Sequence, residues 1–440
     1  MPSLRDVPFT QYALGNGLTV ILSEERSSPV TAVMVMYHAG SKNETPGRTG
    51  LAHLFEHLMF KGSLHVGDGE HFRLLQEIGA SVNATTSEDR TNYFEAVPSN
   101  YLELALYLES DRMGFLPGAI DQAKLDNQRD VVRNERRQSY DNVPYGTAYE
   151  KSARAVYGGA HPYGWPVIGS MEDLAAATLE DALGFFRRYY APGNACLVVT
   201  GDFAQDRASA WIETYFGTLP AGPRVPRLPA KEPELAEDLH LVYEEPVQLP
   251  RLFLTWPAPA RGTREEALMD LFTTILTSGK SSRLYRPLVF GDQIAQAVNA
   301  WSDGKEIAGT VTIDATAKPG VGLGPIEARI QEVLDEILTH GVTDREIASA
   351  FNGKEAQLAA QRTTMLGVAG GLATAFTLSA DTAAFNRELD RFSAVTREEI
   401  TEEARRVFGG PRVALNIVPA GQRALASTAR RSREGGSAAP

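Results

Sequence analysis

Cysteine and long apolar runs are the clearest absences from this chain. A single cysteine, Cys196, stands among 440 residues, so neither an internal disulfide framework nor a cysteine-based zinc site can form. No stretch approaches the roughly 18 unbroken apolar residues that a membrane-spanning helix needs. The opening Met-Pro-Ser-Leu-Arg-Asp-Val-Pro has no apolar segment of the kind found in secretion signals. We therefore expect no membrane span and a cytoplasmic location, or a periplasmic one if a signal peptide has been removed.

An excess of positive charge is also missing. The chain has 43 Lys and Arg against 55 Asp and Glu, which gives a net charge of −12. Because the phosphate backbone of nucleic acids is bound by basic surfaces, we expect no nucleic-acid partner. Hydrophobic residues make up 43% of the chain, which at this length is sufficient for two packed domains.

The strongest functional signal lies in Gly50–Gly62, which reads Gly-Leu-Ala-His-Leu-Phe-Glu-His-Leu-Met-Phe-Lys-Gly. Its spacing predicts a short helix between Thr49 and Gly62. At 3.6 residues per turn, one face of this helix is apolar and consists of Leu51, Leu54, Phe55 and Leu58. Another face carries His53, Glu56 and His57, together with Phe60.

This H-x-x-E-H pattern is the inverted form of the H-E-x-x-H zinc helix, the signature of inverzincins. Two histidines four residues apart, His53 and His57, project from adjacent turns and can bind one metal ion. Glu56 lies on the same face, where it can take a proton from a water that the metal activates. A lone buried histidine is more often a hydrogen-bonded core residue, but a pair with a carboxylate on one face favours a zinc site.

A catalytic zinc usually has a third protein ligand, and the sequence offers two candidates. In the helical stretch Asp121–Tyr140, an apolar stripe is formed by Leu125, Gln128, Val132 and Glu135. A carboxylate on such a stripe is costly to bury without a cation, which makes Glu135 a candidate. The stripe could instead end in solvent, or Glu135 could pair with a neighbouring arginine. Glu77 remains a rival from spacing alone.

Recurring elements predict an α+β fold built from two homologous domains. A helix-to-strand segment of the sequence recurs 218 residues later. Its first copy contains Thr178, Arg187 and Cys196, and its second copy has Thr396, Arg405 and Ala414 at the corresponding positions. We predict a zinc-binding catalytic domain at 1–218, a Pro-rich linker and start of the second domain at 219–250, a homologous domain without zinc at 251–420, and a disordered tail at 421–440.

Local patterns predict the elements that flank the motif. Strands are expected at Val30–His38, Ser81–Thr86, Asn92–Val97, Ala195–Thr200, Arg251–Trp256, Ile294–Trp301, Gly309–Ala315 and Val413–Val418. Helices are expected near His71–Ile78, Glu265–Leu276 and Ser282–Val289.

Three segments resemble the pitrilysin family, which includes insulin-degrading enzyme and the mitochondrial processing peptidase: Gly50–Lys61, Gly79–Tyr93 and Gln128–Glu135. The processing-peptidase-like bacterial branch is the most similar. The resemblance implies a Zn²⁺ ion held by His53, His57 and Glu135, with Glu56 as general base. It also implies that each domain is a mostly antiparallel sheet packed by helices, and that the chain forms half of a clamshell.

The resemblance further implies that peptides bind by strand addition along an edge strand that includes Asn83 and Ala84. Asn83 could also be an ordinary turn residue. Many relatives have a second glutamate seven residues before the zinc-binding one, where this chain has Gln128. The neutral amide can still hydrogen-bond next to the ligands, but it contributes no charge.

A second departure concerns an Arg and a Tyr, seven residues apart, with which full-length relatives hold the substrate carbonyl. The corresponding positions here are Val289 and Gln296, and neither side chain can supply a positive charge to a developing oxyanion. We expect a homologous partner subunit to supply the pair in a heterodimer. Arg283 and Tyr285, in the same region, are expected to be structural or interface residues.

The sequence thus predicts a zinc metalloendopeptidase subunit that hydrolyses peptides or unfolded polypeptides through a metal-activated water. Two alternatives remain. The chain could be a non-catalytic scaffold or binding subunit of the same fold, although the intact H-x-x-E-H motif disfavours this. A di-iron carboxylate site would need repeated Glu-x-x-His pairs on facing helices, and the chain shows none.

Overall fold

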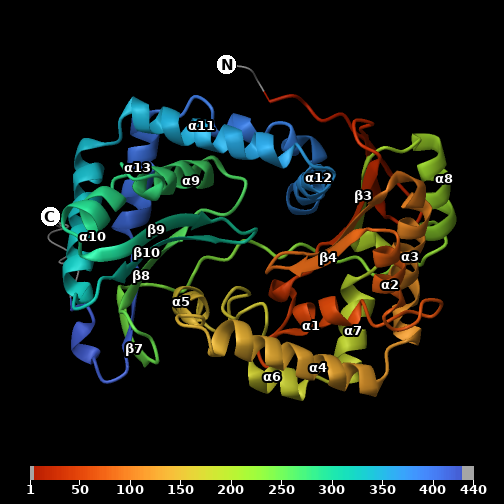
Figure 1. Ribbon diagram of the computed structural model, residues 1–440, viewed down its shortest axis with the longest axis horizontal. Coiled ribbons are helices and arrows are strands. Elements are labelled where there is room, and N and C mark those ends of the chain that lie inside the picture. Colours follow the sequence, from red (N-terminus) through yellow and green to blue (C-terminus); the bar gives the residue numbers. More distant parts are fainter. Residues whose placement is uncertain (1–3, 429–440) are drawn as a thin grey trace, which may run out of the picture. The chain divides into compact units, whose positions relative to one another are not determined.

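The computed structural model describes residues 4–428 and divides into two compact units (Figure 1). Unit 1 consists of Met1–Gln138, Trp165–Pro229 and Gly353–Arg391, and unit 2 of Ser139–Gly164, Ala230–Asn352 and Phe392–Pro440. The chain passes between these two units five times, whereas the predicted domains are contiguous repeats, so the domain boundaries stay a prediction. Within the predicted tail, 421–428 include the short 3-10 helix η9 (Arg423–Leu425), and residues 429–440 lie outside the described residues.

Unit 1 contains a six-stranded sheet with the order β1-β2-β6-β3-β5-β4. Its strands are β1 (Thr10–Ala13), β2 (Thr19–Glu24), β3 (Val30–Tyr37), β4 (Ser81–Thr86), β5 (Thr91–Pro98) and β6 (Ala195–Gly201). The β2–β6 pair is parallel and the other pairs are antiparallel. Because β4 ends the sheet, its outer edge is available to another extended chain.

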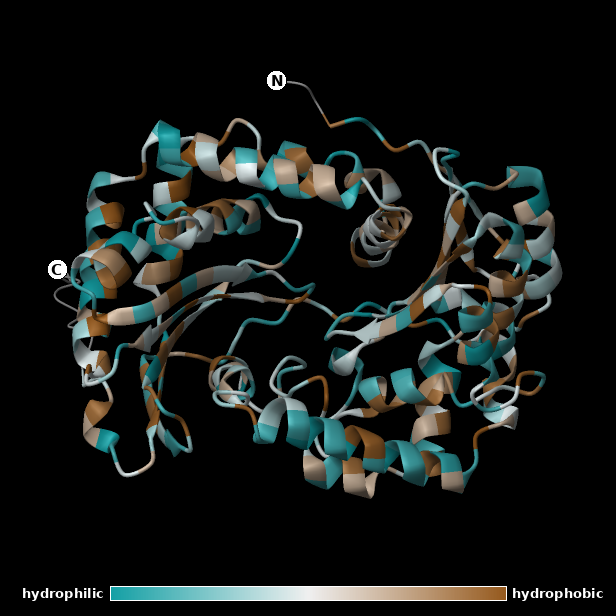
Figure 2. Cartoon of the chain, viewed as in Figure 1, coloured by the Kyte–Doolittle hydropathy of each residue, from teal (hydrophilic) through white to brown (hydrophobic). Residues whose placement is uncertain are grey.

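The helices of unit 1 cover both faces of this sheet. They are α1 (Leu51–Leu58), α2 (Glu70–Glu77), α3 (Leu102–Phe115), α4 (Gln122–Arg136), α6 (Met171–Ala176), α7 (Leu179–Tyr189), α8 (Gln205–Phe216) and α12 (Met365–Ser379). Met34 of β3 packs with Val368 and Leu372 of α12, and β3 is brown, hence apolar, along much of its length in Figure 2. On the opposite face, Tyr37 lies against Tyr190, with ring centroids 4.6 Å apart.

Unit 2 contains a five-stranded sheet with the order β7-β11-β8-β10-β9. Its strands are β7 (Leu239–Glu245), β8 (Arg251–Ala258), β9 (Ala295–Asp303), β10 (Gly309–Ala317) and β11 (Val413–Pro419). Its helices are α5 (Ala148–Tyr157), α9 (Arg264–Thr277), α10 (Leu323–His340) and α13 (Arg397–Gly409). Trp256 of β8 packs with Phe272 of α9 and Phe408 of α13 in the main core. The boundary between the units falls within α11 (Asp344–Gln361).

The two sheets repeat one topology, which confirms the predicted α+β class. Strand β7 is parallel to β11, as β2 is to β6, and β8, β10 and β9 follow in the antiparallel order of β3, β5 and β4. Met36 pairs with Cys196 in unit 1 and Leu254 pairs with Ala414 in unit 2, so the offset of 218 residues extends to the paired strands.

One expectation about local structure needs correction. The helix expected near Ser282–Val289 is a short π-helical segment, η6 (Arg286–Gly291), with Pro287 in its first turn, where the missing backbone donor is tolerated. Residues 219–250, predicted to be a linker and the start of the second domain, contain strand β7, whose residues are half-buried or exposed. Such a strand has little of the alternating burial that would signal it in sequence.

Candidate metal centre and active site

Helix α1 carries the H-x-x-E-H motif and is anchored by its apolar face. Leu51, Leu54, Phe55 and Leu58 are all buried, as the helical spacing predicts. Phe55 lies against Phe186 of α7 at a ring distance of 5.4 Å. The packing of this face leaves the opposite face, with the two histidines, only partly covered.

The start of α1 is fixed by a remote carboxylate, because the residue at its N-terminus has no side chain to cap it. Gly50 has φ of 88°, and a Cβ there would meet the Ile168 carbonyl oxygen at 2.7 Å, so only glycine fits. Glu44 accepts hydrogen bonds from the backbone N–H groups of Gly50 at 2.9 Å and Ala52 at 2.7 Å. Burial raises the pKa of Glu44 to about 8, against the opposite effect of these two hydrogen bonds.

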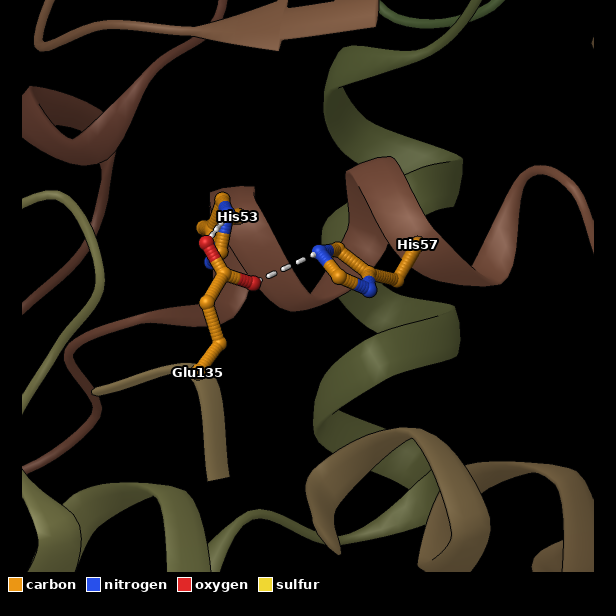
Figure 3. A group of neighbouring side chains, drawn as sticks. All are labelled: His53, His57 and Glu135. Carbon is orange, nitrogen blue, oxygen red and sulfur yellow. Dashed lines mark ion pairs between the residues drawn. The ribbon is translucent and has the colours of Figure 1, made fainter. Parts of the chain in front are cut away.

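His53, His57 and Glu135 converge on one point, with ligand-type atoms within 4.8 Å of one another. Glu135 reaches from α4, and its two carboxylate oxygens lie 3.7 Å from His53 Nε2 and 3.3 Å from His57 Nε2 (Figure 3). A tetrahedral zinc ion with bonds of about 2.0–2.1 Å would hold its ligand atoms about 3.3–3.4 Å apart. The spacing of the three groups therefore fits a zinc ion.

The protonation of the group also suits a metal. Burial, reinforced by the neighbouring His57, lowers the pKa of His53 to about 4, so the ring is neutral at neutral pH. The contact with His57 lowers the pKa of Glu135, which keeps it a carboxylate. A neutral imidazole facing a carboxylate makes no ordinary salt bridge, whereas both are in the form that binds a cation.

Glu77, the rival third ligand, lies elsewhere. It sits on α2, where Arg73 donates to it at 2.7 Å, and its side chain is 59% exposed. Among residues 4–428, the cluster of His53, His57 and Glu135 is the one group whose donor atoms meet the spacing for a metal. The geometry thus favours Glu135 over Glu77, and the assignment of ligands stays a prediction.

Glu56 projects beside the cluster and is held by a hydroxyl. Thr86, the last residue of β4, donates from Oγ1 to Glu56 Oε2 at 2.5 Å. Burial raises the pKa of Glu56 and outweighs the opposite effect of this hydrogen bond. A carboxylate with a raised pKa is a stronger proton acceptor than an ordinary one, as a general base requires.

A cavity of about 300 Å³ opens next to Glu56. It is lined by Glu56, His57, Phe60, Lys61, Gly69, Phe72, Asn83 and Gln128. Phe60 and Phe72 stack with their ring centroids 4.5 Å apart and form an apolar wall. The cavity therefore combines an apolar wall with polar groups beside Glu56.

The structure places Asn83 and Ala84 on the edge strand, as the sequence predicts, with Asn83 exposed and Ala84 buried. Asn83 Oδ1 accepts from the Ala84 N–H at 2.9 Å. Gln128 is buried in the cavity wall and donates to Asn127 Oδ1 at 2.7 Å. A role of these residues in substrate or metal binding stays a prediction.

The sequence analysis did not identify Glu44 and Thr86 as part of this site. Glu44 lies six residues before Gly50, the N-cap of the helix, and no short capping motif joins them. Thr86 has a recognisable signal, because it is two residues after Ala84 and therefore shares its face of the strand. Its contact with Glu56 still depends on how the strand meets α1.

In unit 2, Arg283 binds two carboxylates, Glu346 at 2.5 Å and Glu336 at 3.6 Å. The expected structural or interface role of Arg283 stays a prediction. Val289 packs against the core of unit 2, and Gln296 is exposed on β9. Neither side chain brings a cation to a substrate carbonyl.

Comparisons with known proteins agree with this geometry. Residues 19–155 match the family described as insulinase (peptidase family M16), and residues 176–353 match the peptidase M16 inactive domain. The zinc protease PqqE of Helicobacter pylori is 30% identical over 338 residues, which cover 76% of this chain and 76% of that protein.

The chain belongs to the M16 peptidase family. This confirms the pitrilysin-family resemblance seen in the sequence. An uncharacterized zinc protease of Bacillus subtilis, YmxG, is 26% identical over 77% of this chain and 81% of its own length. The crystal structure of a protease from Helicobacter pylori has a TM-score of 0.87 and 26% identity, covering 94% of this chain and 99% of that chain.

Family membership and the named relatives support a zinc-dependent, peptidase-like function. The family also contains the inactive domain that matches the second part of this chain. Within residues 4–428, no helix is both long and apolar enough to cross a bilayer.

Proposed function

We propose that this chain is a zinc-dependent endopeptidase subunit whose active site lies in unit 1. One observation carries the proposal: His53 and His57 from α1 and Glu135 from α4 direct three ligand-type atoms at one point, next to an unligated carboxylate, Glu56. Three ligands plus an open position is the arrangement of catalytic zinc, whereas structural zinc is closed by four.

His53, His57 and Glu135 would hold the ion. When bound, zinc supplies Lewis acidity that polarises a carbonyl and brings the pKa of a water near 7. Glu56 accepts the proton of the attacking water and later returns it to the leaving amine. Asn83, Ala84 and their neighbours on β4 hold the peptide backbone by strand addition, which tolerates varied sequences. Gln128, which lines the cavity together with His57, supports the ligands through hydrogen bonding without contacting the ion.

A partner subunit completes the proposed enzyme. Val289 and Gln296 cannot stabilise an oxyanion, so a homologous chain with an Arg and a Tyr would close on this one as the other half of a clamshell. Co-expression with a homologous chain should raise peptide cleavage well above that of either chain alone. Full activity from a homogeneous preparation of this chain would contradict the partner requirement.

The test of the chemistry is Glu56→Gln. Because Glu56 is not a ligand, the variant should keep its zinc by elemental analysis while cleavage of a fluorogenic peptide falls about 10²–10⁴-fold. Turnover at the wild-type rate would rule out Glu56 as the base.

A non-catalytic scaffold of the same fold is the second candidate, favoured by the match of residues 176–353 to an inactive domain. A zinc-to-protein ratio near zero in a zinc-supplemented preparation would favour it.

A further inference from the structure

Thr86, which the sequence analysis did not select, lies next to the proposed base of the site. Thr86 belongs to β4, the edge strand that would bind the peptide, and its hydroxyl contacts the proposed base on α1. Its backbone pairs with Thr91 of β5. Thr86 therefore links the sheet edge to Glu56.

The direction of the hydrogen bond follows from the available donors. The Thr86 hydroxyl carries the donor hydrogen and a carboxylate oxygen accepts it, so Thr86 Oγ1 donates to Glu56 Oε2 at 2.5 Å. The neighbouring hydroxyl of Thr91 donates to the Ala39 carbonyl oxygen at 2.9 Å and lies 3.5 Å from Thr86 Oγ1. The single proton of Thr86 is thus directed to Glu56.

We propose that Thr86 is the positioning residue of the proposed general base, and that it reserves Glu56 Oε1 for the proton of the water. With Oε2 held by the hydroxyl, the carboxylate is fixed in rotation and presents its other oxygen to the reaction. The inference rests on the proposed peptidase function of the same site and adds a residue that orients rather than reacts.

Fixing the base from the substrate-binding strand has a mechanistic consequence. A peptide that docks on β4 is placed by the same strand whose last residue orients Glu56. The positions of the scissile bond and of the base are therefore both set by β4. A misplacement of about 1 Å can reduce a rate about 10²-fold, so losing this contact should act on turnover.

The first test compares Thr86→Val with Thr86→Ser. Valine keeps the shape but removes the hydroxyl, and serine restores it. For the chain in its active form, with a partner if one is required, Thr86→Val should lower kcat about 10–100-fold and change KM less than about threefold. Thr86→Ser should recover most of kcat, and both variants should keep the wild-type zinc content.

Thr200→Val is the matched control. Thr200 is a buried threonine of β6 in the same sheet, and its hydroxyl donates to the Met365 carbonyl oxygen at 2.8 Å. The Thr200→Val variant also loses a threonine hydroxyl, but at a position away from the site, so kcat and KM should stay at wild-type values. Wild-type kcat in Thr86→Val, or equal kcat in the valine and serine variants, would overturn the proposal.

A second measurement does not depend on activity. Thermal unfolding of the metal-free wild type, Thr86→Val, Glu56→Ala and the double variant forms a cycle in which the shared hydrogen bond makes the changes in Tm non-additive. Additive changes would mean that the contact does not form. If the wild type neither binds zinc nor cleaves peptides, the proposed function fails, and the cycle still decides whether Thr86 holds Glu56.

Discussion

Helices α1 of unit 1 and α9 of unit 2 follow corresponding strands of two sheets with the same topology. The helix face that carries histidines in α1 carries buried apolar residues in α9. The residues found 218 positions after His53 and His57 are Leu271 and Ile275, which are 1% and 6% exposed in the core of unit 2. The histidines keep 14% and 24% of their side chains exposed around the proposed metal. Both units thus keep the sheet, and only unit 1 has partly exposed histidines on this helix where unit 2 has buried core residues.

The difference extends to the elements around the helix. Strand registers place Trp301 of β9 where β4 has Thr86, and Thr316 of β10 where β5 has Glu95. Helix α9 begins with an ordinary cap, in which Thr263 Oγ1 accepts from the Glu266 N–H at 3.1 Å, whereas α1 relies on Glu44. Unit 1 therefore has Thr86, Glu95 and the anchor Glu44 where unit 2 has Trp301, Thr316 and an ordinary helix cap.

The largest effect is expected from His53→Ala. Loss of one of three ligands should release the zinc, and peptide cleavage should fall at least about 10³-fold because the metal supplies several kcal/mol of transition-state stabilisation. The free energy of unfolding of the metal-free protein should change little, since the ring is partly exposed. Elemental analysis and peptide assays measure both; full zinc occupancy in His53→Ala would remove this residue from the ligand set.

Leu271→Ala, at the corresponding position of unit 2, should do the reverse. Removing a buried leucine from a closely packed core costs about 2–5 kcal/mol of unfolding free energy. Zinc content should stay at the wild-type level in the folded fraction. Denaturant unfolding followed by circular dichroism checks the loss; unchanged stability would show that unit 2 does not use this helix as core.

Changing the caps should separate the two helices again. Glu44→Ala leaves two backbone donors of α1 unpaired next to His53, and we expect zinc affinity to fall about 10–100-fold. The control, Thr263→Ala, removes the cap of α9 and should cost about 1 kcal/mol of stability without any effect on zinc. Competition with a chelator measures the affinity. Equal zinc affinity in Glu44→Ala and the wild type would mean that α1 needs no such anchor.

A pH-dependent change in stability is expected from Glu95→Gln. Glu95 is fully buried, facing Glu109 and Arg112, and burial raises its pKa well above the usual value. The folded protein therefore keeps a proton that the unfolded chain loses near pH 4.5. The contribution of this group to stability is complete below that pH and is lost as pH rises toward the folded-state pKa.

Glutamine is neutral at all pH values, so the variant should gain stability relative to the wild type as pH rises from 5 to 8, by up to about 1.4 kcal/mol per unit. Denaturant unfolding at several pH values measures the difference. A difference that does not vary with pH would mean that Glu95 is ionised in the folded protein.

Features that depend on local spacing could be predicted from the sequence. The helical period of Leu51–Leu58 separates the histidines from the apolar face, and β4 has the predicted bounds Ser81–Thr86. Glu135 could be proposed from its position on an apolar stripe, but spacing could not choose it over Glu77. That choice requires knowing that α4, rather than α2, brings its carboxylate to α1.

Features that depend on distant contacts could not be predicted. Nothing local to residues 353–391 indicates that they belong to unit 1, where α12 covers β3. The hydrogen bond from Thr86 to Glu56 joins residues 30 positions apart through the fit of a strand to a helix. Strand β7 lacks an alternating pattern because most of its residues are only half-buried or exposed.

The most direct test of the proposed metal centre is a crystal structure of the zinc-supplemented chain, with diffraction collected on both sides of the zinc absorption edge. We predict one anomalous peak in unit 1, about 2 Å from His53 Nε2, His57 Nε2 and a Glu135 carboxylate oxygen. A zinc peak bound elsewhere, or no peak in crystals grown with zinc, would contradict the proposed site.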